Sequence, residues 1–371
     1  MKRALWVILC VLLGSVRLPA GAAEVSAASA VLYLPQREQF LFEKQADTVR
    51  PMASTTKLMT ALLLAEAMPA AQTVTVPAGA LPAEGSSMGL KAGDTLSVQA
   101  LCAGMLLASG NDAANAAALL LDNSFPAFAD RMNRRAAALG MDNTVFVTPS
   151  GLDEGAHGAT ARDMARLGAA VLQVPLLREL CATRNMTVTV SGETVWLKNH
   201  NRLLSLYPAC IGLKTGFTRQ AGRCLVSAAE QDGVTLVAVT LRAPDDWNDH
   251  IRLYQEGFAR TRTVDCPAPP PRQIPVIGGE QGCVAVAADA GAPLVLLDEE
   301  RLSTRICLPG VLFAPVRQGQ TLGVMQVFAD RQLLCELPLQ ARDAVPARPS
   351  ASFWRRLRQT WLQLLRDMVA L

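Results

Sequence analysis

Runs of strand length lie at both ends of the segment 25–258. The stretch Val25–Phe42, interrupted by a turn at Pro35–Glu38, predicts a pair of strands. Asp232-Gly233 joins two later runs and is typical of a tight hairpin. The other segments with strand patterns are 186–190, 195–198, 210–215, 224–229 and 234–241.

Between these strands the apolar positions follow a helical period. The stretch that begins at Ser54 is apolar at nearly every position of 58–64, which predicts a buried central helix. Strands at both ends of a helical middle indicate an antiparallel sheet flanked by helices, an α/β (α+β) fold class, instead of a parallel βαβ series. The other helical stretches are 98–107, 112–121, 126–139 and 245–258.

The chain changes character after residue 262. A proline-rich joint at Cys266–Pro271 predicts a domain boundary, and the short strand-like runs beyond it indicate a small all-β domain over 263–345. Residues 346–371 predict an amphipathic helix, with tryptophan and leucine on one face and arginine on the other. This pattern favours a helix on a membrane surface, and the alternative is a helix docked on its own domain.

Residues 1–23 have the three parts of a secretory signal peptide: a basic start, the apolar run Ala4–Val16 and small residues at Ala20–Ala23. We therefore expect export. Lys2, Arg3 and Arg17 account for the whole formal charge of +3, so the mature chain is near neutral. It lacks the concentrated basic face of a nucleic-acid binder.

The numbers and spacing of cysteine and histidine limit which disulfides and metal sites are possible. Eight cysteines follow the N-terminal segment, and this even number permits disulfides without revealing their pairing. Buried free thiols are an equally good interpretation. With three histidines and no Cys-x-x-Cys pair, we expect neither a metal site nor a cofactor.

Three short motifs carry the candidate chemistry. They occur in the order Ser54-Thr55-Thr56-Lys57, Ser109-Gly110-Asn111 and Lys214-Thr215-Gly216. Two of only six lysines in the chain fall within them. Alone, each motif could be a helix cap, an interhelical turn or a strand end, but the three in order are the signature of class A β-lactamases and penicillin-binding proteins. Gly110 breaks the helical pattern, so Asn111 or Asp112 is expected to cap the next helix.

The motifs suit an acyl-transferring serine enzyme. Lys57 follows Ser54 by one helical turn and can take its proton if the amine is neutral, which burial and the charge of Lys214 would favour. Ser109 is suited to pass a proton to a leaving amine. Asn111 is suited to bind substrate or to hold Lys57.

The third motif suits a peptide with a free carboxylate. Lys214 offers a positive charge and Thr215 a hydroxyl donor. Gly216 has no side chain, so a peptide can lie against the strand. The backbone N–H groups of Ser54 and Phe217 are the expected oxyanion donors.

Further stretches strengthen one resemblance. Over residues 24–262 the chain resembles the D-alanyl-D-alanine carboxypeptidases, the low-molecular-mass penicillin-binding proteins of serine peptidase family S11. In the β domain and tail it resembles them in arrangement only. The matching stretches are 132–133, 139–141, 149–152, 160–165, 199–204, 214–218 and 221–222.

The resemblance implies a penicillin-recognising serine hydrolase fold and a catalytic domain over 24–262. It implies that Ser54 is the nucleophile, Lys57 the proton acceptor and Ser109 a relay, while Lys214 binds substrate. The substrate would be a peptidoglycan stem pentapeptide that loses its terminal D-alanine through an acyl-enzyme, and β-lactams would be inhibitors. The enzyme would act in the cell envelope, at the outer face of the cytoplasmic membrane.

Some assignments stay open at this level. Arg242 lies near the place where some relatives carry a carboxylate-binding arginine, but the alignment needs a one-residue shift. We interpret His157 as a packing or helix-start residue. Alternative functions are a D-alanyl-D-alanine endopeptidase, a class A-like β-lactamase, for which a Glu-x-x-Leu-Asn motif is missing, and a non-catalytic β-lactam sensor.

Overall fold

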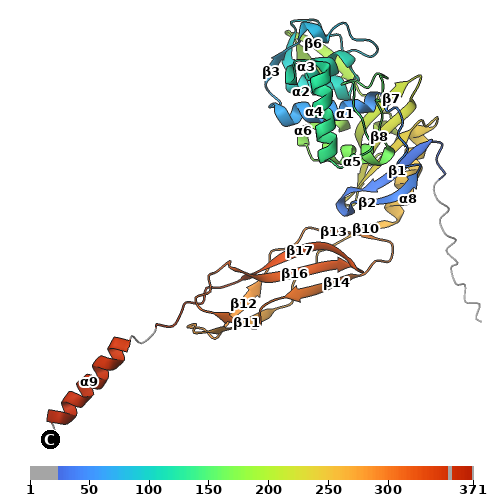
Figure 1. The fold of residues 1–371 in the computed structure, drawn as a ribbon. Coiled ribbons are helices and arrows are strands. Elements are labelled where there is room, and N and C mark those ends of the chain that lie inside the picture. Colours follow the sequence, from blue (N-terminus) through green and yellow to red (C-terminus); the bar gives the residue numbers. More distant parts are fainter. Residues whose placement is uncertain (1–23, 350–352, 370–371) are drawn as a thin grey trace, which may run out of the picture. The chain divides into compact units, whose positions relative to one another are not determined.

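The structure is a computed structural model that describes residues 24–349 and 353–369 (Figure 1). The predicted signal peptide at 1–23 lies outside the described residues. The chain divides into two compact units, one up to Arg260 and one from Thr261.

The first unit is built on a five-stranded antiparallel sheet in the order β2-β1-β9-β8-β7. The N-terminal strand pair therefore joins the late strands, as the sequence pattern indicates. The strands are β1 (Ser29–Leu34), β2 (Gln39–Lys44), β7 (Cys210–Thr218), β8 (Gly222–Gln231) and β9 (Val234–Leu241).

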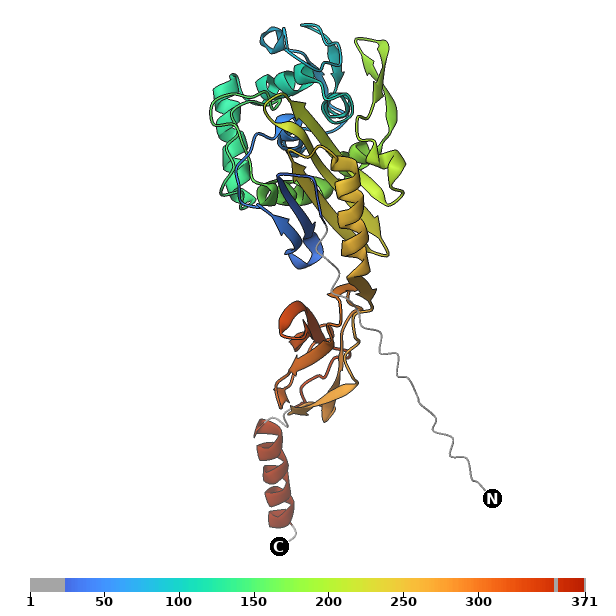
Figure 2. The ribbon, with the colours of Figure 1, turned by 90° about the vertical axis from the view of Figure 1, so that its right-hand side faces the viewer.

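Two helices cover opposite faces of this sheet (Figure 2). Gly168 of α5 (Ala161–Leu172) lies against Val237, whereas Gly257 of α8 (Asp246–Ala259) lies against Leu236. Neighbouring residues of a strand point to opposite faces, so the two helices must lie on different sides. Neither glycine has space for a larger side chain, because a Cβ atom would lie within 3.0 Å of a core side chain.

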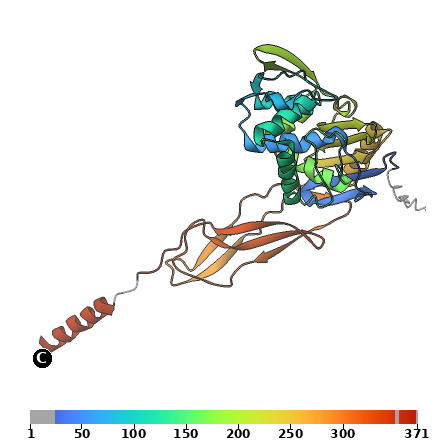
Figure 3. The same cartoon turned by 45° about the horizontal axis from the view of Figure 1, so that its top comes forward.

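The remaining helices lie in the part of the first unit that holds the first two motifs, whereas the third motif lies on β7 (Figure 3). The helix α1 is buried from Lys57 to Leu64, as its apolar sequence predicts. Side-chain oxygens of Ser97, Ser124 and Thr160 accept backbone N–H groups and so begin α2, α4 and α5. These helices are α1 (Lys57–Ala67), α2 (Val98–Leu106), α3 (Asn111–Leu121), α4 (Phe125–Ala138), α6 (Pro175–Ala182) and α7 (Leu203–Leu206).

Two hairpins stand apart from the main sheet. They pair β3 (Thr73–Thr75) with β4 (Thr95–Ser97) and β5 (Asn185–Val190) with β6 (Glu193–Lys198).

The second unit is mostly β structure. A six-stranded sheet has the order β14-β16-β17-β12-β11-β15, and β10 pairs with β13. The last described element is the helix α9 (Phe353–Val369). The strands are β10 (Thr261–Val264), β11 (Arg272–Ile277), β12 (Cys283–Ala287), β13 (Leu294–Leu297), β14 (Leu302–Cys307), β15 (Leu312–Phe313), β16 (Thr321–Ala329) and β17 (Gln332–Ala341).

Candidate active site

Ser54 and Lys57 lie at the start of the central helix. Ser54 belongs to the short 3₁₀ turn η2 (Ala53–Thr56), and Lys57 is the first residue of α1, so the α-helix begins three residues later than the sequence pattern suggests. The Lys57 side chain is fully buried. Its Nζ lies 3.0 Å from Ser54 Oγ, 2.6 Å from Asn111 Oδ1 and 2.7 Å from the Ser150 carbonyl oxygen. The serine hydroxyl is therefore within proton-transfer distance of a lysine amine.

Burial and a second lysine alter the charge of this site. Burial lowers the pKa of Lys57 well below its usual value, and the nearby charge of Lys214 lowers it further, against the opposing effect of Asp112. Burial also lowers the pKa of Lys214, to about 8. The Lys214 ammonium donates a hydrogen bond to the Thr215 carbonyl oxygen at 3.0 Å. The arrangement can therefore hold a neutral amine at Lys57 beside a charged one at Lys214.

Close backbone contacts fix the turn that carries Ser54. Ala53 has a positive φ of 48°, which is unusual for a residue with a side chain. A Cβ atom at Gly151 would lie 2.0 Å from the Ala53 carbonyl oxygen, and one at Gly216 would lie 3.0 Å from the Ser54 nitrogen. Glycine at these two positions lets the loop around 151 and strand β7 approach the turn.

The second motif connects α2 to α3. Ser109 is buried and has a φ of 60°. Besides accepting from Lys57, Asn111 donates from Nδ2 to the Glu84 carbonyl oxygen at 2.5 Å. The amide of Asn111 therefore joins the lysine to the segment that precedes α2.

The expected capping of α3 by Asn111 or Asp112 is wrong. The N-cap residue of α3 is Gly110, which makes no side-chain capping hydrogen bond, although Asp112 Oδ1 accepts from the Ala113 N–H within the first turn. The buried Asp112 carboxylate also accepts from the backbone N–H groups of Met88, Gly89 and Leu90 and from the Ser87 hydroxyl. A carboxylate with this many donors is a strong local tie, and here it holds the segment that carries Ser86.

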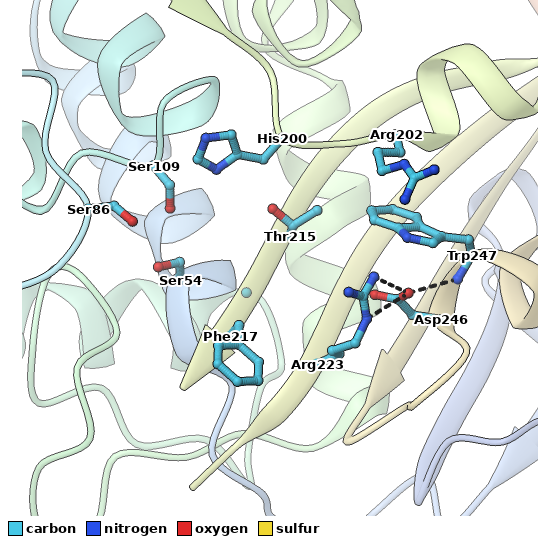
Figure 4. A pocket seen from close by; sticks show the side chains of 11 residues that line it. Ser54, Ser86, Ser109, His200, Arg202, Thr215, Phe217, Arg223, Asp246 and Trp247 are labelled. Atoms are coloured by element: carbon cyan, nitrogen blue, oxygen red, sulfur yellow. Dashed lines mark hydrogen bonds and ion pairs between the residues drawn. The ribbon is translucent and has the colours of Figure 1, made fainter. Parts of the chain in front are cut away.

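A cleft of about 370 Å³ opens beside Ser54 (Figure 4). It brings together Ser54, Ser109, Thr215, Gly216 and Phe217, all of which the sequence motifs point to. Lys57, Asn111 and Lys214 are buried and do not line it. The sequence analysis assigned no role to the other lining residues, although two of them, His200 and Arg202, lie in the matching stretch 199–204. These other residues are Ser86, His200, Arg202, Arg223, Asp246 and Trp247.

An arginine with two side-chain partners lines this cleft. Arg223 of β8 pairs in register with Phe217 of β7, so it lies next to the third motif. Its guanidinium donates from Nη2 and Nε to Asp246 Oδ1 at 2.5 and 3.1 Å and lies 5.1 Å from the centre of the Trp247 ring. The Asp246 side chain is only 3% exposed, and burial raises its pKa against the opposing effect of Arg223. Arg242, in contrast, is exposed and does not line the cleft.

A metal site requires that side chains that could bind a metal ion lie close together. Within 24–349 and 353–369 there is no group of three or more histidine, cysteine or acidic residues that could hold a metal ion. The eight cysteines of these ranges are free thiols in the structure.

A serine beside a buried lysine, next to a strand with a second buried lysine, defines the class of acyl-transferring serine hydrolases. The family model described as D-alanyl-D-alanine carboxypeptidase, Peptidase_S11, matches residues 17–245. The chain therefore belongs to peptidase family S11 and is a serine-type hydrolase.

Similar proteins span nearly the whole chain. D-alanyl-D-alanine carboxypeptidase DacF of Bacillus subtilis is 29% identical over 358 residues, which are 90% of each chain. DacC of Escherichia coli, also a D-alanyl-D-alanine carboxypeptidase, is 34% identical and covers 82% of this chain and 80% of its own. The crystal structure of penicillin-binding protein 5 from Haemophilus influenzae aligns with a TM-score of 0.68 and 27% identity, over 87% of this chain and 98% of that one. The predicted fold class and family are thereby confirmed.

Proposed function

We propose that this protein is a D-alanyl-D-alanine carboxypeptidase that removes the terminal D-alanine from peptidoglycan stem pentapeptides through an acyl-enzyme on Ser54. The observation that carries the proposal is the 3.0 Å contact between Ser54 Oγ and the buried Lys57 amine. The catalytic domain would span 24–262, followed by the β-rich domain at 263–345 and the tail at 346–371. β-Lactams would acylate the same serine as substrate mimics.

The reaction begins with attack of Ser54 Oγ on the carbonyl carbon of the penultimate D-alanine. The hydroxyl proton moves to Lys57 Nζ, and the backbone N–H groups of Ser54 and Phe217 bind the resulting oxyanion. The C–N bond then breaks, and Ser109 passes a proton to the departing D-alanine amine. Water hydrolyses the ester on Ser54 and regenerates the enzyme, so no cofactor is required.

The substrate carboxylate would bind where Thr215 and Arg223 line the cleft, near the charge of Lys214. Asp246 uses Nε and Nη2 of the Arg223 guanidinium, which leaves Nη1 to donate to a ligand. Trp247 supports the guanidinium plane. Arg223 takes this role in place of Arg242, because Arg242 lies outside the cleft.

The two lysine pKa values predict a pH profile with two limbs. Acylation of Ser54 should slow in acid, where Lys57 becomes protonated, and in alkali as Lys214 loses its charge near pH 8. The maximum should therefore lie below pH 8. The measurement is the second-order acylation rate constant with a fluorescent penicillin from pH 5 to 10. A rate that keeps rising through pH 9 would contradict a need for the Lys214 charge.

A signal peptide at 1–23 would export the enzyme to the outer face of the cytoplasmic membrane, and α9 would hold it there. None of the helices in the described ranges is long and apolar enough to cross a bilayer. Leu357, Trp361 and Leu365, spaced four residues apart on α9, are all exposed. Four-residue spacing puts them on one face, which suits a helix lying in the interface.

Binding to vesicles tests the role of α9. The full chain should sediment with vesicles that contain phosphatidylglycerol, and Trp361→Glu should release it. Gln359→Glu adds the same charge about 200° around the helix and should leave most of the protein bound. Equal release by the two variants, or no binding by the parent, would exclude an interfacial α9.

Three substrates separate the proposed activity from its alternatives: a stem pentapeptide, a cross-linked dimer and penicillin. The purified enzyme should release D-alanine from a stem pentapeptide much faster than it cleaves a cross-linked dimer. The reverse ratio would identify an endopeptidase, and rapid turnover of penicillin would identify a β-lactamase. A stable penicillin adduct with neither peptide cleaved would identify a sensor.

A further inference from the structure

His157 connects two segments of the first unit. It is 6% exposed, and in the sequence it lies far from Lys57 and Lys214. Its Nδ1 is 2.9 Å from the Val147 nitrogen and 3.4 Å from the Thr148 nitrogen. Its Nε2 is 2.9 Å from Thr56 Oγ1, in the turn that carries Ser54.

These partners determine the tautomer of the ring. A backbone N–H can only donate, so Nδ1 must be an unprotonated acceptor. Burial lowers the pKa of His157 to about 4, although Asp153 acts in the opposite direction, so the ring is neutral at neutral pH with its proton on Nε2. Nε2 then donates to Thr56 Oγ1, which in turn donates to the Ala53 carbonyl oxygen at 2.8 Å.

The loop that His157 anchors supplies an acceptor to Lys57. The Ser150 carbonyl oxygen lies 2.7 Å from Lys57 Nζ, and the Pro149 carbonyl oxygen lies 2.6 Å from Thr60 Oγ1 of α1. Thr148 Oγ1 closes the loop by donating to the Leu152 carbonyl oxygen at 3.0 Å. The loop therefore contacts the helix that bears Lys57 and is fixed by His157 at its beginning.

We propose that His157 is a positioning residue for acylation: the neutral ring ties loop 147–152 to the turn of Ser54 and thereby fixes the Ser150 carbonyl that orients the Lys57 amine. His157 touches neither Lys57 nor the cleft, so it acts through these two segments. The inference rests on the proposed roles of Ser54 and Lys57. A proton acceptor must be held within a fraction of an ångström, and a misplacement of about 1 Å can cost about 10²-fold in rate.

The test compares two substitutions in the full-length enzyme. His157→Ala removes the hydrogen bonds of both ring nitrogens, whereas His157→Asn keeps an acceptor near the position of Nδ1 for the Val147 N–H. Active sites are counted by the mass of the penicillin adduct, so misfolded protein does not enter kcat. We expect His157→Ala to lower kcat about 10- to 100-fold with KM within about 3-fold, and His157→Asn to restore part of the loss.

His250 provides a matched control. It is also fully buried, with burial lowering its pKa to about 3, and its ring nitrogens lie 2.6 Å from Ser227 Oγ and 2.9 Å from Thr240 Oγ1. Both partners belong to the sheet and neither contacts Lys57 or loop 147–152. His250→Ala should lower the melting temperature while kcat per active site stays within about 3-fold of the parent.

The outcomes test the positioning role of His157 separately from the proposed carboxypeptidase function. If His157 and His250 variants lose similar stability and all keep their kcat, His157 is only structural and the inference is wrong. If His157→Ala does not fold, the test rests on His157→Asn. Unchanged values of kcat, KM and the acylation rate in His157→Asn would overturn the inference. If the parent enzyme releases no D-alanine, the proposed function fails, and the acylation rate with penicillin still measures the effect of His157.

Discussion

Replacing Lys57 with methionine is expected to lower the rate of Ser54 acylation by at least about 10³-fold, the scale of removing a general base that acts with a nucleophile. Methionine has a similar length and fills the same buried space, so the change removes the amine that lies 3.0 Å from Ser54 Oγ with little loss of packing. Stopped-flow measurement with a fluorescent penicillin gives the rate.

Two comparisons make this result specific. Lys91→Met changes an exposed lysine in the same way and should leave the acylation rate within about 2-fold, because exposed substitutions away from the site have small effects. Melting curves should show that Lys57→Met remains folded. A folded Lys57→Met variant that is acylated at a tenth of the parent rate or faster would mean that another group accepts the proton.

Replacing Arg223 with glutamine is expected to lower kcat/KM for a pentapeptide by about 10- to 100-fold, which corresponds to a charge-assisted hydrogen bond of about 1.5–3 kcal/mol. The substitution alone would leave the Asp246 carboxylate buried without its partner. The variant is therefore best combined with Asp246→Asn, which removes that charge as well.

A change of substrate isolates the contact with the carboxylate. A pentapeptide whose terminal carboxyl is amidated offers no negative charge to Arg223, so parent and variant should differ by less than about 3-fold on it. Arg242→Gln should be nearly neutral on both substrates, since Arg242 does not line the cleft. Equal losses on the free acid and the amide would assign Arg223 to maintaining the fold instead of binding the carboxylate.

The side chains of the candidate site could be selected from the sequence, because the proposed chemistry requires particular residue types at short spacings. Ser54 and Lys57 share one turn, and Lys214 to Phe217 share one strand, so local geometry places them. The apolar pattern of 58–64 likewise predicts the burial of α1. The lowering of the Lys57 pKa by burial and by the charge of Lys214 was also expected from the residue types, and in the structure burial is the larger of these two causes.

Groups that depend on tertiary contacts carried no such signal. The acceptor from residue 150 is a backbone carbonyl, which any amino acid provides, so no residue type marks it. Arg223 and Asp246 are 23 positions apart and meet only because α8 packs on the sheet. One signal was present: Arg223 follows the turn after β7, and pairing the two strands in register places it beside Phe217.

The backbone conformation around Ser54 was also not predicted from the sequence. The turn before α1 has a positive φ at Ala53, and alanine is not a residue type that marks this conformation. The close contact of this turn with Gly151 involves a residue about 100 positions later in the chain. The helix α5 did have a signal, because Thr160 and Asp163 are spaced as a helix start and the Thr160 hydroxyl accepts from the Asp163 N–H.

Release of D-alanine from a stem pentapeptide, measured side by side for the full-length enzyme and Ser54→Ala, tests the central claim most directly. We expect steady release by the parent and a rate at least about 10³-fold lower for Ser54→Ala, because the variant has no nucleophile to form the acyl-enzyme. Equal release by the two proteins would remove Ser54 from the mechanism, and with it the assignment of the cleft beside Lys57 as the active site.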